Sequence, residues 1–288
     1  ARQAPLSALA KLTLQAHDVV VKGVLRQPFG AITIRSTEGV PHLVDGSELS
    51  VSGDGVKVPV GSMVNKTQWV YKTDGIAAGQ AVDTSVQTVS ILNGQSIDKG
   101  ILVEGKGLKI DSQSNLLAQA GGDLLTWEFQ SGVGGSQDAL AQPNVYAVLP
   151  GYTYDFAPHD TEILNSQKAL GTAWAAGDQI EVKVDTGVLK AGRYTLLPAR
   201  YALLPGAVRV SVGPAGVAGN QEVTQRDDGS VVVSGYKTHA GTQINGGNDA
   251  RLTLILESES TFRAKSDLSV TAVSDLLKQQ AKKLGDAV

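Results

Sequence analysis

The chain has 288 residues, a formal net charge of −3 and no cysteine, and 42% of its residues are hydrophobic. This length and composition are sufficient for the cores of one or two domains. The near-neutral charge gives no electrostatic reason to expect nucleic acid or an anionic membrane as partner. Without cysteine, disulfides, thiolate metal sites and cysteine nucleophiles are excluded. No apolar run reaches the length of a membrane span.

The first part of the chain, residues 1–61, alternates in short apolar bursts. Leu12-Thr-Leu14, Ile32-Thr-Ile34 and Leu49-Ser-Val51 follow one another at intervals near twenty residues. Period-two alternation predicts strands, and an interval near twenty is typical of the coils of a β-solenoid. An antiparallel sandwich of short strands fits the periodicity equally well. If the coils exist, Leu12, Ile32 and Leu49 should point into one core.

The middle of the chain departs twice from this rhythm. Residues 62–98 fit it poorly and predict an extruded hairpin or loop, after which residues 99–128 restore it as a further coil. Prolines and tyrosines then gather in residues 129–250, where no coil-length repeat is visible. A solenoid wall cannot absorb so long an irregular stretch, because each coil must pair with its neighbours. The pattern predicts a separate β-rich lobe, extruded from one turn.

The final segment, residues 251–288, predicts a return to the coils followed by a helix. Leu252-Thr-Leu254-Ile-Leu256 alternates like the early strands. Ser274 then precedes an amphipathic pattern that ends at Gly285. A serine N-cap and a terminal glycine are typical helix boundaries, so we expect an amphipathic helix of about ten residues there.

A tandem repeat lies at the centre of the predicted lobe. Tyr194-Thr-Leu-Leu-Pro198 is followed by Tyr201-Ala-Leu-Leu-Pro205, and a third copy, Tyr146-Ala-Val-Leu-Pro150, lies upstream. Proline has no N–H to donate, so each copy predicts a strand that ends at its proline. The predicted lobe core is Tyr146, Leu149, Tyr194, Leu196, Leu197, Tyr201, Leu203 and Leu204. The alternative is an exposed apolar tract that serves as an adhesive surface.

Arg200 lies between the two tandem copies, as a charge beside this predicted core. An unpaired buried charge is costly. We therefore expect Arg200 to emerge at the edge of the lobe or to pair with an acid such as Asp155 or Asp178.

The stretch GRYTLLPARYALLPGA, residues 192–207, resembles a signature of the filamentous-haemagglutinin family, the large bacterial exoproteins exported by two-partner secretion. Trp127–Asp138 and Asn65–Tyr71 extend the resemblance, which covers roughly residues 49–240. Exoproteins of this family are built on a right-handed parallel β-helix. The resemblance therefore favours an all-β chain: a right-handed parallel β-helix (β-solenoid) with a β-rich extra-helical insertion and a short C-terminal helix.

The resemblance also implies a function. The chain would be a non-enzymatic internal segment of a secreted or cell-surface adhesin, with a binding lobe on a β-helical stalk, acting in cell adhesion and virulence. Its partners would be a flanking β-helix of the same polypeptide, the outer-membrane two-partner transporter during secretion, and a receptor or glycan on a host or bacterial surface. The candidate surface contacts are Trp69, Tyr71, Tyr152 and Tyr154. A purely structural fibre segment and a β-helical polysaccharide-processing enzyme are the alternatives.

No sequence motif indicates catalysis. The four histidines have no ligand-like spacing. Asp155–Asp160 is the densest group of titratable residues, and a solvated loop explains it as well as a cation site does. Gly132–Asp138 lacks the lysine of a phosphate-binding loop, and the Gly-x-Ser-x-Gly nucleophile motif is absent. We expect no catalytic residue, no metal ion and no cofactor.

Overall fold

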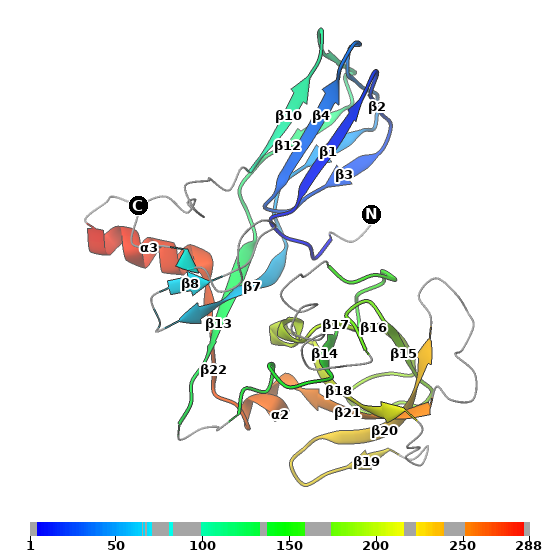
Figure 1. The fold of residues 1–288 in the computed structure, drawn as a ribbon, viewed down its shortest axis with the longest axis vertical. Coiled ribbons are helices and arrows are strands. Elements are labelled where there is room, and N and C mark those ends of the chain that lie inside the picture. Colours follow the sequence, from blue (N-terminus) through cyan, green and yellow to red (C-terminus); the bar gives the residue numbers. More distant parts are fainter. Residues whose placement is uncertain are drawn as a thin grey trace. The chain divides into compact units, whose positions relative to one another are not determined.

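The computed structural model describes residues 5–64, 66, 68–70, 81–82, 99–132, 137–158, 174–215, 223–238 and 251–284. The chain forms two compact units (Figure 1): unit 1 contains residues 1–126 and 271–288, and unit 2 contains residues 127–270. Unit 2 is therefore an insertion in the chain of unit 1. None of the helices in the described ranges is long and apolar enough to cross a membrane.

Unit 1 contains three small parallel sheets, each with three strands (Figure 1). They are β1 (Lys11–Ala16), β4 (Ala31–Ser36) and β10 (Gly100–Glu104); β2 (Val20–Val21), β5 (His42–Leu43) and β11 (Lys109–Ile110); and β3 (Val24–Arg26), β6 (Glu48–Ser50) and β12 (Asn115–Leu117). We call residues 11–26, 31–50 and 100–117 the first, second and third tiers. In every sheet the strand of the second tier lies between the other two.

The second tier provides most of the core of these sheets. Ile32, Ile34, Leu43 and Leu49 are fully buried and pack with Val19 and Val21 of the first tier. Parallel pairing in register places Ile32 between Leu12 of the first tier and Ile101 of the third tier. The expectation that Leu12 shares this core is wrong, because Leu12 stays half-buried outside the cluster. Within the described residues, the strand that contains Leu12 pairs with another strand on one side only, and Leu12 is not among the residues that pack in the cluster.

The remaining sheet has five strands: β7 (Lys57–Val64), β8 (Gln68–Val70), β9 (Ala81–Val82), β13 (Asp123–Phe129) and β22 (Leu268–Ala272). Of these, β7, β8 and β9 pair antiparallel. Trp69 is buried here, and its Nε1 donates a hydrogen bond of 2.8 Å to the carbonyl of Val60. The terminal helix α3 (Val273–Leu284) contributes Val273 and Leu276 to the same cluster.

Unit 2 is built on one antiparallel sheet of eight strands (Figure 1). Its order is β16 (Gly192–Thr195), β15 (Gln179–Val182), β20 (Val231–Thr238), β21 (Arg251–Ser258), β18 (Val208–Ala215), β14 (Val145–Val148) and β17 (Leu197–Pro198), with β19 (Thr224–Gln225) paired to β20. The first and last strands of this order, β16 and β17, are separated in sequence by Leu196 alone. The sheet therefore curls into a nearly closed barrel.

The tandem repeat closes this barrel. Its first copy spans the end of β16 and all of β17, and the upstream copy lies beside it, with Tyr146 opposite Pro198 and Ala147 opposite Leu197. The second copy is not a strand end as predicted, because Ala199–Leu203 forms the 3₁₀ helix η1. Pro198 opens η1 without an N–H to continue a ladder, and the N–H of Leu204 bonds back to the carbonyl of Tyr201.

The predicted β-helix is wrong as the fold class of this chain. The eight-stranded sheet of unit 2 is antiparallel throughout, and the three short sheets of unit 1 are parallel. Arg251–Ser258, expected to re-enter the coils, is instead β21, an inner strand of the barrel sheet. Leu252, Leu254 and Leu256 point into the barrel core. Period-two alternation is the same in parallel and antiparallel strands, so the pattern alone could not separate them.

We expect Leu197→Ala to destabilise unit 2 by about 2–5 kcal/mol, because Leu197 is fully buried where the barrel closes. Thermal and urea unfolding of the full chain measure the change. Phe156→Ala removes a larger but exposed side chain from the same unit and should leave the transition almost unchanged. Equal effects of the two substitutions would contradict the burial assigned to Leu197.

Candidate functional site

The predicted lobe core lies almost entirely inside unit 2. Leu149 is half-buried, and the other seven predicted residues are buried: Tyr146, Tyr194, Leu196, Leu197, Tyr201, Leu203 and Leu204. This burial argues against the alternative of an exposed adhesive tract. Arg200 is half-buried and lies 5.6 Å from the centre of the Tyr201 ring. Asp178, one of its two expected partners, forms an ion pair with Lys237.

Two of the four predicted surface contacts are wrong. Trp69 is buried in the hairpin cluster of unit 1, and Tyr152 is buried in unit 2. The hydroxyl of Tyr152 donates a 2.6 Å hydrogen bond to the carbonyl of Phe156, so its polar end is satisfied within the protein. Burial, with Tyr201 and Tyr154 nearby, raises the pKa of Tyr152 far above its ordinary value. Tyr71 lies outside the described residues.

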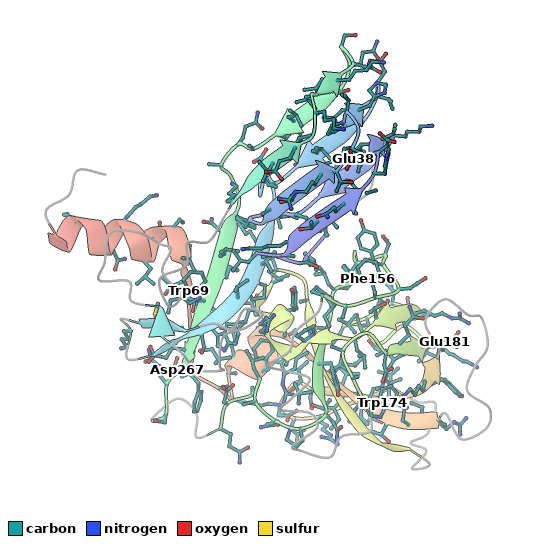
Figure 2. All side chains as sticks on the ribbon, turned by 45° about the horizontal axis from the view of Figure 1, so that its top comes forward. Glu38, Trp69, Phe156, Trp174, Glu181 and Asp267 are labelled. Atoms are coloured by element: carbon teal, nitrogen blue, oxygen red, sulfur yellow. The ribbon has the colours of Figure 1, made fainter. Side chains whose placement is uncertain are left out.

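Tyr154 belongs to a short aromatic ladder on the surface of unit 2. Its ring centre lies 5.4 Å from that of Tyr152 and 5.2 Å from that of Phe156. Phe156 is the outermost member, and Figure 2 labels it; its exposed fraction is 53%. The ladder thus has a buried base and an exposed tip. In the sequence, this ladder is visible as the alternation of Tyr152, Tyr154 and Phe156. Only the two tyrosines were predicted as surface contacts.

A second surface group crosses four neighbouring strands of the barrel. Glu181 of β15 pairs with Arg193 of β16 on one side and with Tyr236 of β20 on the other, and Tyr236 pairs with Arg251 of β21. We call Arg193, Glu181, Tyr236 and Arg251 the outer row. Their neighbours along the strands, such as Ile180, Val182 and Leu252, fill the barrel core, so the outer row faces away from it.

Tyr236 is the centre of the outer row. The ammonium of Lys183 lies 4.2 Å from the centre of its ring, and the guanidinium carbon of Arg251 lies 5.9 Å from it. Arg251 Nη2 also donates a 3.4 Å hydrogen bond to the tyrosine hydroxyl. Cations over the face of an aromatic ring are attracted by its quadrupole. With Lys183, the row has three cationic groups, one carboxylate and one aromatic ring.

The outer row can bind but carries no recognisable catalytic constellation. Guanidinium and ammonium groups bind anionic or carbonyl oxygens, and the carboxylate accepts hydrogen bonds from hydroxyl groups. Within the described ranges, no group of three or more histidines and acids could hold a metal ion. In the Asp155–Asp160 group, Asp155 accepts a hydrogen bond of 3.1 Å from Gln179. His159 and Asp160 lie outside the described residues.

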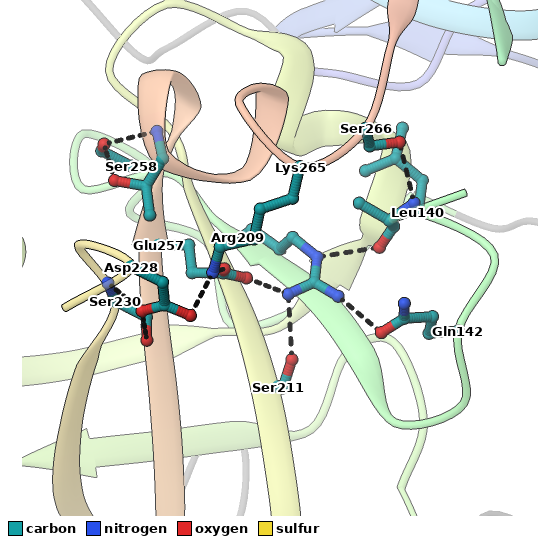
Figure 3. A network of polar contacts seen from close by, with 12 residues as sticks. Leu140, Gln142, Arg209, Ser211, Asp228, Ser230, Glu257, Ser258, Lys265 and Ser266 are labelled. Atoms are coloured by element: carbon teal, nitrogen blue, oxygen red, sulfur yellow. Dashed lines mark hydrogen bonds and ion pairs between the residues drawn. The ribbon is translucent and has the colours of Figure 1, made fainter. Parts of the chain in front are cut away.

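A buried polar network fixes the other side of the barrel (Figure 3). Arg209 of β18 and Glu257 of β21 pair directly, and both side chains are almost completely buried. Lys265 extends the network, with its ammonium 2.5 Å from Glu257 and 2.6 Å from Asp228. Arg209 also donates to the carbonyl of Ala139 and to the side chains of Ser211 and Gln142.

This network ties segments that are distant in sequence to the two central strands. Each of the three nitrogen atoms of the Arg209 guanidinium donates to at least one acceptor (Figure 3), as a buried charge requires. The composition and burial of the network make it a structural element. In the outer row, by contrast, Arg193 is exposed and Glu181, Tyr236 and Arg251 are half-buried. No family model, curated protein or solved structure matches this chain.

The sequence alone predicts neither the outer row nor the buried network. Both depend on contacts between segments up to 70 residues apart in the sequence, and the sequence contains no short motif for either. The one available signal was the strand containing Glu181 and Lys183, whose charged residues alternate with apolar ones.

The buried pair can be tested by a double-mutant cycle. Glu257→Leu alone leaves Arg209 as a buried charge without its carboxylate, so we expect a loss of about 3–5 kcal/mol in the free energy of unfolding. Arg209→Met combined with Glu257→Leu removes both charges, and the double variant should be the more stable of the two. Urea unfolding gives each value. A double variant no more stable than Glu257→Leu would show that the ion pair does not dominate the network.

Asp228 should make the free energy of unfolding of unit 2 depend on pH in the acidic range. The ammonium of Lys265 and the groups of Ser230 lower the pKa of this carboxyl in the folded chain. Its stabilising effect is therefore full above the unfolded pKa of about 4 and is lost as the pH falls toward the lower folded value. Asp228→Asn should weaken the chain at pH 7 and flatten its stability profile below pH 4.

The exposed neighbour Asp227 provides the control for this measurement. Asp227→Asn makes the same chemical change one residue away and should retain the wild-type profile. If the two variants have the same acid profile, the assigned role of Asp228 is wrong.

Proposed function

We propose that this chain is a non-enzymatic segment of a secreted or surface-displayed bacterial exoprotein of the filamentous-haemagglutinin kind, and that unit 2 is its binding module. The observation that carries the proposal is the outer row on an inserted barrel. A binding module requires recognition groups on a rigid frame. The members of the outer row lie on four neighbouring strands that are hydrogen-bonded to one another.

The connection between the two units supports a display role. Unit 2 leaves the chain of unit 1 in β13 and returns in β22, and these two strands are neighbours in one sheet. At this point the N–H of Gln130 donates a 2.9 Å hydrogen bond to the carbonyl of Asp267. An insertion whose ends lie together can be carried by a scaffold without interrupting it.

The chemistry of the outer row favours a polar, oxygen-rich ligand on a cell surface, such as a glycan or an acidic receptor segment. Charged and aromatic side chains with little exposed aliphatic surface are suited to hydroxyl and anionic groups. Secretion by a two-partner transporter and a role in adhesion are part of the same proposal, and both rest on the resemblance of residues 192–207.

The binding role is tested with labelled full-length chain on glycan arrays and on cultured epithelial and bacterial cells. Two variants change the outer row: the single variant Tyr236→Ala and the double variant Lys183→Ala/Arg251→Ala. Each should reduce the amount of bound protein by roughly tenfold or more, equivalent to about 1.4 kcal/mol or more. Lys190→Ala removes an exposed cation from unit 2 outside the row and should bind like the wild type.

Three outcomes of this experiment would favour another reading over binding by the outer row. Loss of binding in Phe156→Ala but not in the outer-row variants would move the site to the aromatic ladder. Wild-type chain that binds neither arrays nor cells would support the purely structural fibre segment. Equal binding by the wild type and all variants would overturn unit 2 as the binding module.

A further inference from the structure

The aromatic ladder is anchored on the barrel by two buried side chains. The hydroxyl of Thr195 donates a hydrogen bond of 2.8 Å to the carbonyl of Tyr154. Nε2 of Gln179 donates one of 3.1 Å to the carboxylate of Asp155 and one of 3.2 Å to the hydroxyl of Thr195. Gln179 and Thr195 are both 6% exposed. Buried polar groups that are hydrogen-bonded rigidify their surroundings, so the ladder has a fixed position on unit 2.

The two strands that anchor the ladder also carry half of the outer row. Gln179 of β15 lies opposite Thr195 of β16. Two residues further along the same strands, Glu181 lies opposite Arg193. The intervening Ile180 fills the barrel core, so both pairs point to the outer face of the sheet. Two residues of a strand span about 7 Å. The ladder and the outer row are therefore neighbours on one face of unit 2.

The ladder and the outer row offer a ligand different chemistry. Phe156 is 53% exposed, and its ring centre lies 5.2 Å from that of Tyr154. The face of an aromatic ring is weakly negative, so it attracts the C–H groups of a sugar ring.

The charges beside this ring are mixed. The cations of the outer row and Lys183 bind a carboxylate, whereas the carboxylates of Glu181 and Asp155 accept hydrogen bonds from hydroxyl groups. Two carboxylates next to three cations favour a ligand that has hydroxyl donors as well as a negative charge. A carboxylated sugar has both, and a run of acidic residues in a peptide has only the charge.

We propose that the aromatic ladder and the outer row form one extended site for an acidic oligosaccharide. A neutral sugar ring packs on Phe156, and the carboxylate of an adjoining sugar binds the cations of the outer row. Because the two groups are separated along the strands by about 7 Å, the ligand extends over more than one sugar ring. This inference rests on the proposed binding role of unit 2 and specifies the ligand of that role.

Calorimetric titration of the full chain with defined saccharides tests the extended site. The probes are sialyllactose and a hyaluronan tetrasaccharide, which both join a carboxylated sugar to a neutral one, and lactose is the neutral comparison. The wild type should bind at least one acidic probe more tightly than lactose. The acidic probe that it prefers shows whether the carboxylate comes from a sialic acid or from a uronic acid.

Variants of Phe156 and of the outer row separate the two parts of the site. Phe156→Leu removes the ring but keeps an apolar side chain, and it should raise the Kd of the preferred acidic probe by roughly tenfold. Phe156→Tyr keeps the ring and should bind like the wild type. Added salt screens exposed charges. The Phe156→Leu variant should therefore keep the salt dependence of the wild type, whereas Lys183→Ala/Arg251→Ala should reduce it.

The outcomes distinguish this inference from the proposed binding role. A Phe156→Leu variant, folded by circular dichroism, that binds the acidic probe like the wild type would overturn the joint site and leave binding by the outer row intact. Lactose bound as tightly as both acidic probes, or neither acidic probe bound, would overturn the acidic oligosaccharide. A glutamate-rich peptide bound more tightly than both acidic probes would assign a protein ligand instead. The proposed binding role itself fails only if the wild type also binds neither arrays nor cells.

Discussion

The closure of the barrel at Leu196 is the constraint on which the rest of unit 2 depends. The backbone of Leu196 bonds toward β15, donating to Asp178 and accepting from Gly177, both at 2.8 Å. The next residue, Leu197, already pairs with Ala147 on the opposite edge of the sheet. Two consecutive residues thus connect the two edge regions of the sheet. Within the described residues, the three parallel sheets of unit 1 show no equivalent closure.

Closure also explains the division of polar groups in unit 2. A sheet that curls on itself has one apolar interior, so every charged side chain must lie on its outer side. Where other segments cover that side, the charges form the satisfied network around Arg209. On the strands β16, β15, β20 and β21, they form the outer row around Tyr236. Strand β21 contributes to both groups, with Glu257 in the network and Arg251 in the row, so the network that stabilises the barrel also fixes one of the strands that carry the row.

Local features were predictable from the sequence and long-range ones were not. The alternation at Ile32–Ile34 and at Leu252–Leu256 marked strands, and the proline-ended repeat was placed in a buried segment. The pattern could not show that β21 pairs antiparallel in the barrel, because side-chain alternation is independent of strand direction. Trp69 and Tyr152 were expected at the surface, yet each ring is buried with its polar atom bonded to a carbonyl. The outer row required the register of four strands, which no local pattern contains.

The adjacency of Gln130 and Asp267 has an evolutionary consequence. A segment that leaves and re-enters through hydrogen-bonded neighbours behaves as a cassette, because recombination at two nearby points could replace it with any domain of similar end spacing or with a short hairpin turn. The strands β13 and β22 would remain paired in each case. The inserted segment could thus change in sequence and size as a whole, while the packing of the buried side chains restricts substitutions in the parallel tiers.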